Sequence, residues 1–166
     1  MLDFVGFLDK IVSIEEAVKL CSLWRENGKK LVFTNGCFDI LHKGHVSYLE
    51  AARDFGDYLI IGLNSDTSVT RIKGKGRPLK SEENRAAVLA ALSSVDAVTI
   101  FNEDTPKELI ERLSPDVLVK GADYKIEDIV GADHVLSNGG EVKTIAFLPG
   151  YSSSKIINKM DKGNGN

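Results

Sequence analysis

Short apolar runs rich in β-branched residues alternate along the chain with stretches whose apolar residues recur at helical spacing. The apolar runs predict five buried strands, at residues 31–34, 58–63, 97–101, 117–119 and 142–147. The stretches of helical period predict five helices, at residues 14–26, 46–55, 81–92, 106–113 and 153–160. Ser81 is a candidate N-cap for the third of these helices. Strands and helices therefore alternate over most of the chain.

Such an alternation favours an α/β fold, with a five-stranded parallel sheet, right-handed crossovers and helices on both faces. Ligands of such sheets bind beyond the carboxyl ends of the strands, near a switch in strand order. A length of 166 residues, with 43% hydrophobic and 27% charged residues, suits one domain, expected at residues 1–160. Residues 161–166 are rich in Gly, Asn and Lys and are expected to form a frayed tail.

Composition and charge argue against several classes of protein. No apolar run approaches the roughly 20 residues that cross a bilayer, and the first residues do not resemble a signal peptide, so a cytoplasmic location without membrane contact is expected. Cys21 and Cys37 are too few for a disulfide framework and are expected to be free thiols. A net charge of -3 argues against a general nucleic-acid binder. Any anion site must come from local clustering.

A glycine-containing turn connects the first predicted strand to the helix expected from Val46. A helix start offers unpaired backbone N–H groups and a partial positive charge, which suits phosphate binding. His42 and His45 are three residues apart and can face the same side there, while Gly44 leaves room for a phosphate or ribose. The same turn holds Asn35, Gly36, Phe38 and Asp39.

Two plainer interpretations of this turn stay open. His42 and His45 could ligate zinc together with Cys37, although no fourth ligand is apparent. Asp39 could be only a turn or capping residue. The combination of a strand, a glycine turn, a Phe-Asp pair and two histidines is nevertheless a specific signal.

A basic segment follows the second predicted strand and the residues Asn64, Ser65 and Asp66. Six basic residues fall within fifteen positions: Arg71, Lys73, Lys75, Arg77, Lys80 and Arg85. They form a local cation cluster on an acidic protein. With Gly74 and Gly76, the segment is expected to be a flexible loop that can fold over a triphosphate and exclude water. A solvated loop would explain the composition equally well.

Two other segments carry candidate residues at element ends. The fourth predicted strand is followed by Lys120, Gly121, Asp123 and Tyr124, which could also be only a tight turn with a core aromatic. The last predicted helix is preceded by Ser152, Ser153 and Ser154. Serine hydroxyls and helix-start N–H groups can bind phosphates, or the serines can simply cap the helix.

The pattern Gly36-x-Phe38-Asp39 followed by His42-x-Gly44-His45 resembles the signature of the HxGH nucleotidyltransferase superfamily, whose fold is Rossmann-like. More narrowly, FTNGCFDILHKGHVSYLEAARDFGD, GLNSDTSVTRIKGKGRPL, NEDTPKELIERLSPDVLVKGADY and NGGEVKTIAFLPGYSSSKII resemble adenylyltransferases that activate D-glycero-β-D-manno-heptose 1-phosphate. The resemblance covers about residues 10–160. In many bacteria that activity is fused to a sugar kinase, and this chain resembles the stand-alone form.

The resemblance implies an enzyme that transfers AMP from ATP, with Mg²⁺, to a heptose 1-phosphate, giving ADP-heptose and pyrophosphate. It implies catalytic roles for His42, His45, Lys73 and Lys75. Nucleotide binding is implied for Asn35, Gly36, Phe38, Asp39, Gly44, Arg85, Gly121, Ser152, Ser153 and Ser154. Acceptor binding is implied for Asn64, Asp66, Lys120, Asp123 and Tyr124. Related enzymes are commonly homo-oligomers, so a dimer is expected.

Two other functions stay open. A cytidylyltransferase acting on a polyol phosphate such as glycerol 3-phosphate is the rival within the class, although the arginine that precedes the serine motif of cytidylyltransferases is absent here. A nucleotide-binding regulatory protein without turnover is the rival from another class. The intact pair His42 and His45 argues against it, because loss of catalysis would show there first.

Overall fold

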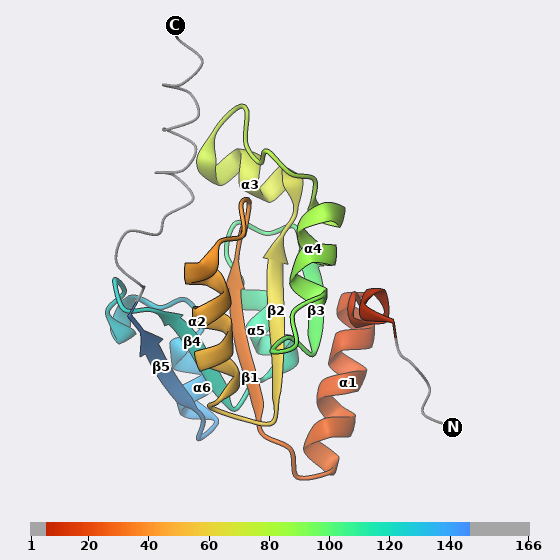
Figure 1. Cartoon of the computed structure of the whole chain (residues 1–166). Coiled ribbons are helices and arrows are strands. Elements are labelled where there is room, and N and C mark those ends of the chain that lie inside the picture. The colour runs from red at the N-terminus through yellow and green to blue at the C-terminus, as the bar shows by residue number, and fades with distance from the viewer. Residues whose placement is uncertain (1–5, 147–166) are drawn as a thin grey trace, which may run out of the picture.

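The computed structural model describes residues 6–146, which are built around a five-stranded parallel sheet of order β3-β2-β1-β4-β5 (Figure 1). Its strands are β1 (Leu31–Gly36), β2 (Tyr58–Asn64), β3 (Ala97–Phe101), β4 (Val117–Gly121) and β5 (Glu141–Ile145). All five predicted strands are present, and each neighbouring pair is parallel. The predicted Rossmann-like α/β fold is therefore confirmed.

Within the same residues, the 3₁₀ helix η1 (Phe7–Lys10) and the α-helix α1 (Ile14–Glu26) precede the first strand, and the other helices lie between successive strands (Figure 1). The other α-helices are α2 (Lys43–Arg53), α3 (Asp66–Lys73), α4 (Glu82–Ala90), α5 (Lys107–Leu113) and α6 (Ala132–Ser137). The other 3₁₀ helix is η2 (Ile126–Asp128).

The sheet separates two apolar layers, because successive side chains of a strand point to opposite faces. Leu31 and Phe33 of β1 belong to the layer formed with α1, α5 and α6. Val32 belongs to the layer formed with α2 and α4. A strand buried on both faces reads as a continuous apolar run, which is how these strands could be recognised in the sequence.

Side-chain caps fix the starts of two predicted helices. At α1, Ser13 Oγ accepts from the N–H of Glu16 at 3.2 Å, and the Glu16 carboxylate accepts from the N–H of Ser13 at 2.8 Å. This reciprocal pair satisfies two N–H groups that the helix itself leaves without partners. Ser81 caps α4, as predicted. Helix α2 begins at Lys43, one turn earlier than predicted.

The prediction of a flexible loop throughout the basic segment is wrong for its first part. Asp66–Lys73 forms the helix α3, whose N-cap Ser65 accepts from the N–H of Ser68 at 3.1 Å. The helix ends at Gly74, whose φ of 94° a residue with a Cβ rarely adopts. Arg71 and Lys73 therefore project from a helix, and only residues 74–80 form a connecting loop. Helix α6 was likewise not predicted.

Some predictions lie beyond the part of the chain that the structure describes. They concern Phe147 at the end of the fifth strand, the helix at residues 153–160 and the tail at residues 161–166. Ser152, Ser153 and Ser154 also lie outside the described residues. The role in nucleotide binding that the resemblance implies for these serines stays a prediction.

The strand order reverses at β1, which has β2 on one side and β4 on the other. Parallel strands end at the same edge, so the turns after β1, β2 and β4 meet there (Figure 1). Open α/β sheets bind ligands at such a switch point. The fold therefore brings the predicted histidine turn and the residues after Asn64 and Val119 to one edge.

Residues 6–146 contain no helix with the length and apolar character needed to cross a membrane. The cytoplasmic location and the single domain at residues 1–160 stay predictions.

Leu118 of β4 is 0% exposed, whereas Leu23 of α1 is 53% exposed. Leu118→Ala is expected to lower the free energy of unfolding by about 2–5 kcal/mol, because it removes transfer free energy and leaves a cavity. Leu23→Ala, with the same atoms removed, is expected to change it by less than about 0.5 kcal/mol. Urea unfolding of both variants measures the difference, and equal losses would contradict the layered core.

Candidate active site

The turn between β1 and α2 is folded around Phe38. Phe38 has a φ of 45°, a left-handed conformation that costs a non-glycine residue on the order of 1–3 kcal/mol. Its ring lies over Gly36, where a Cβ would come within 2.9 Å of a ring atom. The same ring meets the imidazole of His45 edge-on, with the centroids 5.3 Å apart. The glycine thus makes room for the ring that supports His45.

The two histidines lie together at the start of α2. His42 is the N-cap residue with an extended backbone, and no side chain caps the helix start. His45 lies in the first turn, and the two imidazole rings stack with centroids 3.8 Å apart and an interplanar angle of 22°. Both rings therefore lie beside the partial positive charge of a helix start, where an anion is favoured.

Both imidazoles are neutral at neutral pH. Burial lowers the pKa of His42 below its ordinary value of 6.5. For His45, burial lowers the pKa to about 4, with smaller electrostatic contributions in the same direction from His42 and Lys73, although a backbone hydrogen bond with Ile40 acts in the opposite direction. A neutral imidazole can donate one hydrogen bond without carrying a charge. The pair is therefore suited to hydrogen bonding with a phosphate rather than to forming a fixed cation.

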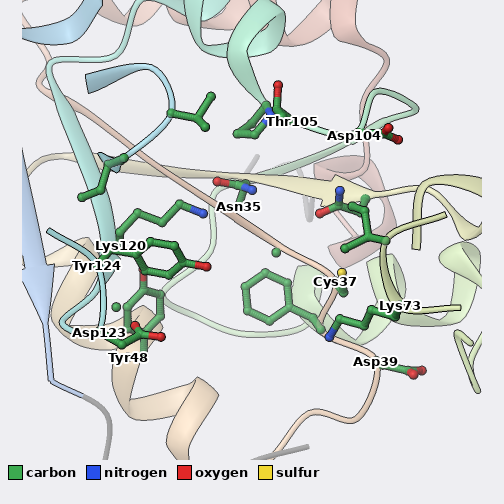
Figure 2. Close-up of a pocket in the computed structure, with 18 of the residues that line it drawn as sticks. Asn35, Cys37, Asp39, Tyr48, Lys73, Asp104, Thr105, Lys120, Asp123 and Tyr124 are labelled. Carbon is green, nitrogen blue, oxygen red and sulfur yellow. The ribbon is translucent and has the colours of Figure 1, made fainter. Parts of the chain in front are cut away.

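A cavity of about 470 Å³ opens at the carboxyl edge of the sheet (Figure 2). Its volume suits a small-molecule ligand. The structure brings most of the predicted site residues to its walls. They are Asn35, Gly36, Phe38, Asp39, His45, Asn64, Lys73, Lys120, Gly121, Asp123 and Tyr124.

Other predicted residues do not line this cavity. His42 stacks on His45 without lining the cavity, and Gly44 is buried in the first turn of α2. Lys75 is exposed on the loop after α3. Asp66 and Arg85 pair with each other at 2.8 Å outside the cavity wall.

Two lysines supply positive charge to the cavity from opposite sides of the view in Figure 2. Lys73 enters from the end of α3. Lys120 enters from β4, with its ammonium 5.7 Å from the centre of the Tyr124 ring. Burial lowers the pKa of Lys120 to about 8, although Cys37 and Asp123 act in the opposite direction. A buried ammonium of this kind favours an anionic ligand, because an anion restores the charged form.

Both carboxylate oxygens of Asp39 are engaged by other residues of the protein. Its side chain is 0% exposed, and Oδ2 accepts from Arg77 Nε at 2.7 Å. Oδ1 accepts from the N–H groups of Leu79 at 2.8 Å and Lys80 at 3.1 Å. Burial alone would raise the pKa of Asp39, but these hydrogen bonds lower it overall. Asp39 therefore binds the loop after α3.

Arg85 is also committed to the protein itself. It is 2% exposed, and its guanidinium donates to the carbonyls of Cys37 at 2.6 Å, Asn64 at 2.9 Å and Lys80 at 3.0 Å. A fourth bond goes to the Asp66 carboxylate. The phosphate contact implied for Arg85 stays a prediction, and this geometry favours a structural role, because the side chain joins three turns of the carboxyl edge.

One wall of the cavity was missed by the sequence analysis. It consists of Asp104, Thr105 and Pro106, which follow β3. Helix α3 holds this segment, because Arg71 Nε donates to Asp104 at 2.7 Å and Ser68 Oγ donates to the Glu103 carbonyl at 2.9 Å. Only the position of the segment in the sequence could have indicated it, because it follows a strand at the edge where the other turns meet.

Tyr48 of α2 also lines the cavity and was missed. Its hydroxyl shares a buried hydrogen bond of 2.9 Å with Thr34 Oγ1. Burial raises the pKa of Tyr48 to about 12, so the hydroxyl stays protonated. In the sequence, Tyr48 is one of several apolar or aromatic residues on the inner face of a helix, and nothing distinguishes it from core.

Among residues 6–146, no three His, Cys, Asp or Glu side chains come together in a way that could hold a metal ion. A zinc site built on Cys37, His42 and His45 therefore has no geometric support in this part of the chain.

A cavity at the switch point, with a histidine pair beside it at a helix start and two lysines in its walls, is suited to binding phosphate groups. Comparison with known proteins identifies the family. The cytidylyltransferase-like family matches residues 33–159, and the chain belongs to it. The protein is accordingly a nucleotidyltransferase.

The chain is also similar in sequence to individual named proteins. The chain is 54% identical over 151 residues to "Bifunctional protein HldE" of Marinomonas sp. (strain MWYL1), covering 91% of this chain and 32% of that protein. A protein of the same name from Koribacter versatilis (strain Ellin345) is 53% identical, with 90% and 31% covered. The chain thus spans about a third of the length of these relatives.

A solved structure is also similar in fold. The lipopolysaccharide core biosynthesis protein from Thermoplasma volcanium GSS1 matches with a TM-score of 0.60 and 30% identity. The match covers 73% of this chain and 98% of that one.

The imidazole of His45 is expected to titrate with a midpoint near pH 4, because its pKa is lowered to about 4 in the folded protein. An unfolded histidine takes up its proton near pH 6.5. The contribution of His45 to stability is therefore complete above pH 6.5 and is lost as the pH falls toward 4. NMR of histidine-labelled protein, assigned with His45→Gln, measures the midpoint. A midpoint near 6.5 would show that His45 is not desolvated.

Proposed function

We propose that the protein transfers AMP from ATP to D-glycero-β-D-manno-heptose 1-phosphate, releasing ADP-heptose and pyrophosphate for assembly of a lipopolysaccharide core. The identity of more than half of the aligned residues with proteins named HldE supports this acceptor. The name of the similar solved structure, a lipopolysaccharide core biosynthesis protein, agrees with it. The observation that carries the reaction type is the neutral pair of His42 and His45 beside a cavity with two lysines.

The reaction is an in-line displacement. A phosphate oxygen of the acceptor forms a bond to the α-phosphorus of ATP, and the bond to the bridging α–β oxygen breaks with release of pyrophosphate. A phosphate monoester is already a charged nucleophile at neutral pH, so neither a general base nor a covalent intermediate is required. The protein mainly positions two anions and stabilises charge on the transferring group.

Each cationic or donor group has a place in this scheme. His45 donates a hydrogen bond to the transferring phosphate, and His42 supports the ring of His45 by stacking. Lys73 offsets the charge of the triphosphate. Lys120 meets the acceptor phosphate, because its buried ammonium gains most from an anionic partner.

Mg²⁺ is proposed as part of the nucleotide substrate. It keeps several water ligands and needs few ligands from the protein when it is bound to a triphosphate. Asp123 and Asp128 line the cavity and can provide a carboxylate oxygen, whereas both oxygens of Asp39 are engaged. Bound there, Mg²⁺ would offset charge on the leaving pyrophosphate. A cytoplasmic location and a homodimer remain part of the proposal.

The acceptor and nucleotide are tested by measuring pyrophosphate release with Mg²⁺, combining ATP, CTP and GTP with heptose 1-phosphate, glycerol 3-phosphate and phosphopantetheine. We expect turnover only for ATP with heptose 1-phosphate. Turnover with CTP and glycerol 3-phosphate would replace the substrates and keep the reaction type. Absence of turnover for all nine pairs would favour a nucleotide-binding protein without catalysis, contrary to the proposal.

His45→Ala is expected to lower kcat by about 10²–10³-fold, because it removes a hydrogen bond that strengthens as charge develops on the phosphate. The KM for ATP should change much less than kcat. His134→Ala is the matched control, since His134 lies on α6 and bonds with Ser114 at 3.0 Å, away from the cavity. Steady-state kinetics with heptose 1-phosphate measure both effects, and near-normal kcat in His45→Ala would contradict the assigned role.

A further inference from the structure

The loop after α3, residues 74–80, is here called the strap. It begins at Gly74 and bends again at Gly76, with φ values of 94° and 88°. A Cβ added at either glycine would meet no atom within 4 Å. A side chain at either bend would therefore meet open space, and polar contacts made further along the strap help to hold its position.

Three of those contacts converge on Asp39, and a further one is the hydrogen bond of 3.0 Å that Arg85 donates to the carbonyl of Lys80. The carboxylate of Asp39 accepts from Arg77 Nε at 2.7 Å and from the N–H groups of Leu79 at 2.8 Å and Lys80 at 3.1 Å. Thr70 of α3 donates to the Arg77 carbonyl at 2.6 Å. Residues 77–80 of the strap are thus held by the turn between β1 and α2 and by the preceding helix, α3.

The ion pair between Asp39 and Arg77 is largely removed from water. Their side chains are 0% and 17% exposed, respectively. Removing one member of such a pair leaves the other charge buried without compensation. Breaking this pair should therefore release the strap rather than let water replace the lost contact.

The same carboxylate belongs to the turn that holds the histidine pair. Asp39 follows Phe38, whose ring contacts His45, and both Phe38 and Asp39 line the main cavity. They also line a second cavity of about 420 Å³ against α4, so this turn is a thin wall between two spaces. At the near end of the strap, Lys73 lines the main cavity, and Lys75 follows Gly74. The contacts of Asp39 therefore connect the turn that holds the histidines to the loop that carries Lys75 and that begins directly after Lys73 of α3.

We infer that Asp39 and Arg77 are positioning residues that hold the strap against the histidine turn and so set Lys73 and Lys75 for the triphosphate. The inference rests on the proposed function for the identity of the ligand. Asp39 acts through the strap and does not touch the reacting atoms. Arg77 Nη2 is buried and has no hydrogen-bond partner among the described residues, so a direct contact of Arg77 with the nucleotide is the rival that the test must separate.

The test uses Arg77→Gln, Asp39→Asn and the double variant of the full chain. Asp39→Asn keeps an oxygen for the two backbone N–H groups but turns an N–H₂ group toward Arg77 Nε. In both single variants we expect the amides of Leu79 and Lys80 to exchange hydrogen about tenfold faster or more, because a charge-assisted contact is lost. We expect kcat/KM for ATP to fall on the order of 10- to 100-fold. The double variant should be no worse than the poorer single variant, since the two residues act through one contact.

Arg53→Gln is the matched control. Arg53 Nε donates to Asp96 at 2.8 Å, and the same carboxylate oxygen accepts a backbone N–H from Leu59 at 2.7 Å, outside the cavity wall. Its loss should lower stability and leave kcat/KM within about twofold of the parent. Arg77→Lys, which keeps the charge, should recover part of the exchange protection and of the activity.

Two outcomes would overturn the inference. A fall in kcat/KM with unchanged exchange at Leu79 and Lys80 would mean that Arg77 contacts the nucleotide directly. Faster exchange with unchanged kcat/KM would mean that the strap does not set the lysines. Hydrogen exchange needs no turnover, so a parent protein inactive on every substrate pair would defeat the proposed function alone. Hydrogen exchange at Leu79 and Lys80 would then still test whether Asp39 holds the strap. The affinity for ATP would test whether the strap positions the lysines, and we expect it to weaken in Arg77→Gln but not in Arg53→Gln.

Discussion

The short turn between β1 and α2 places the two histidines at the edge of the cavity. Its central residue, Phe38, holds a left-handed φ of 45°, which directs the Asp39 side chain into the protein and the Phe38 ring against His45. Without that bend, α2 would not begin at Lys43 with the histidines stacked at its start. Backbone strain of this kind persists only when surrounding contacts hold it. Here the strained conformation of Phe38 is held by the packing of its ring on Gly36 and by the hydrogen bonds of Asp39.

The electrostatics of the cavity follow from burial more than from net charge. The chain carries three more acidic than basic residues, yet the walls of the cavity present Lys73 and Lys120. Beside them, His45 is kept neutral by burial and by neighbouring positive charge. A neutral donor among cations adds hydrogen bonding without adding repulsion. An anionic substrate therefore meets both fixed charge and a donor whose protonation does not change near neutral pH.

Sequence patterns were sufficient for elements whose signal is local. The strands were found because burial on both faces makes them apolar throughout, and the Ser81 cap preceded its helix directly. Helix α3 was missed because its basic residues, with Gly74 and Gly76, suggested a flexible loop, although Ser65 and Gly74 marked its two ends. The engagement of Asp39 by the strap could not be predicted, because the partners lie about 40 positions apart and meet only through the sheet topology.

The two-faced sheet also restricts how the length of this chain can vary during evolution. Deleting one residue within β1, such as Thr34, would move the strand residues on one side of the deletion to the opposite face, so either Val32 and Phe33 would exchange apolar layers or Asn35 would turn away from the cavity. Exposed residues at the opposite edge, such as 27–29, carry no such constraint. Insertions and deletions are therefore tolerated in the loops that precede the strands and excluded within the strands and the turns that carry the site residues. The length of those preceding loops can diverge without altering the chemistry.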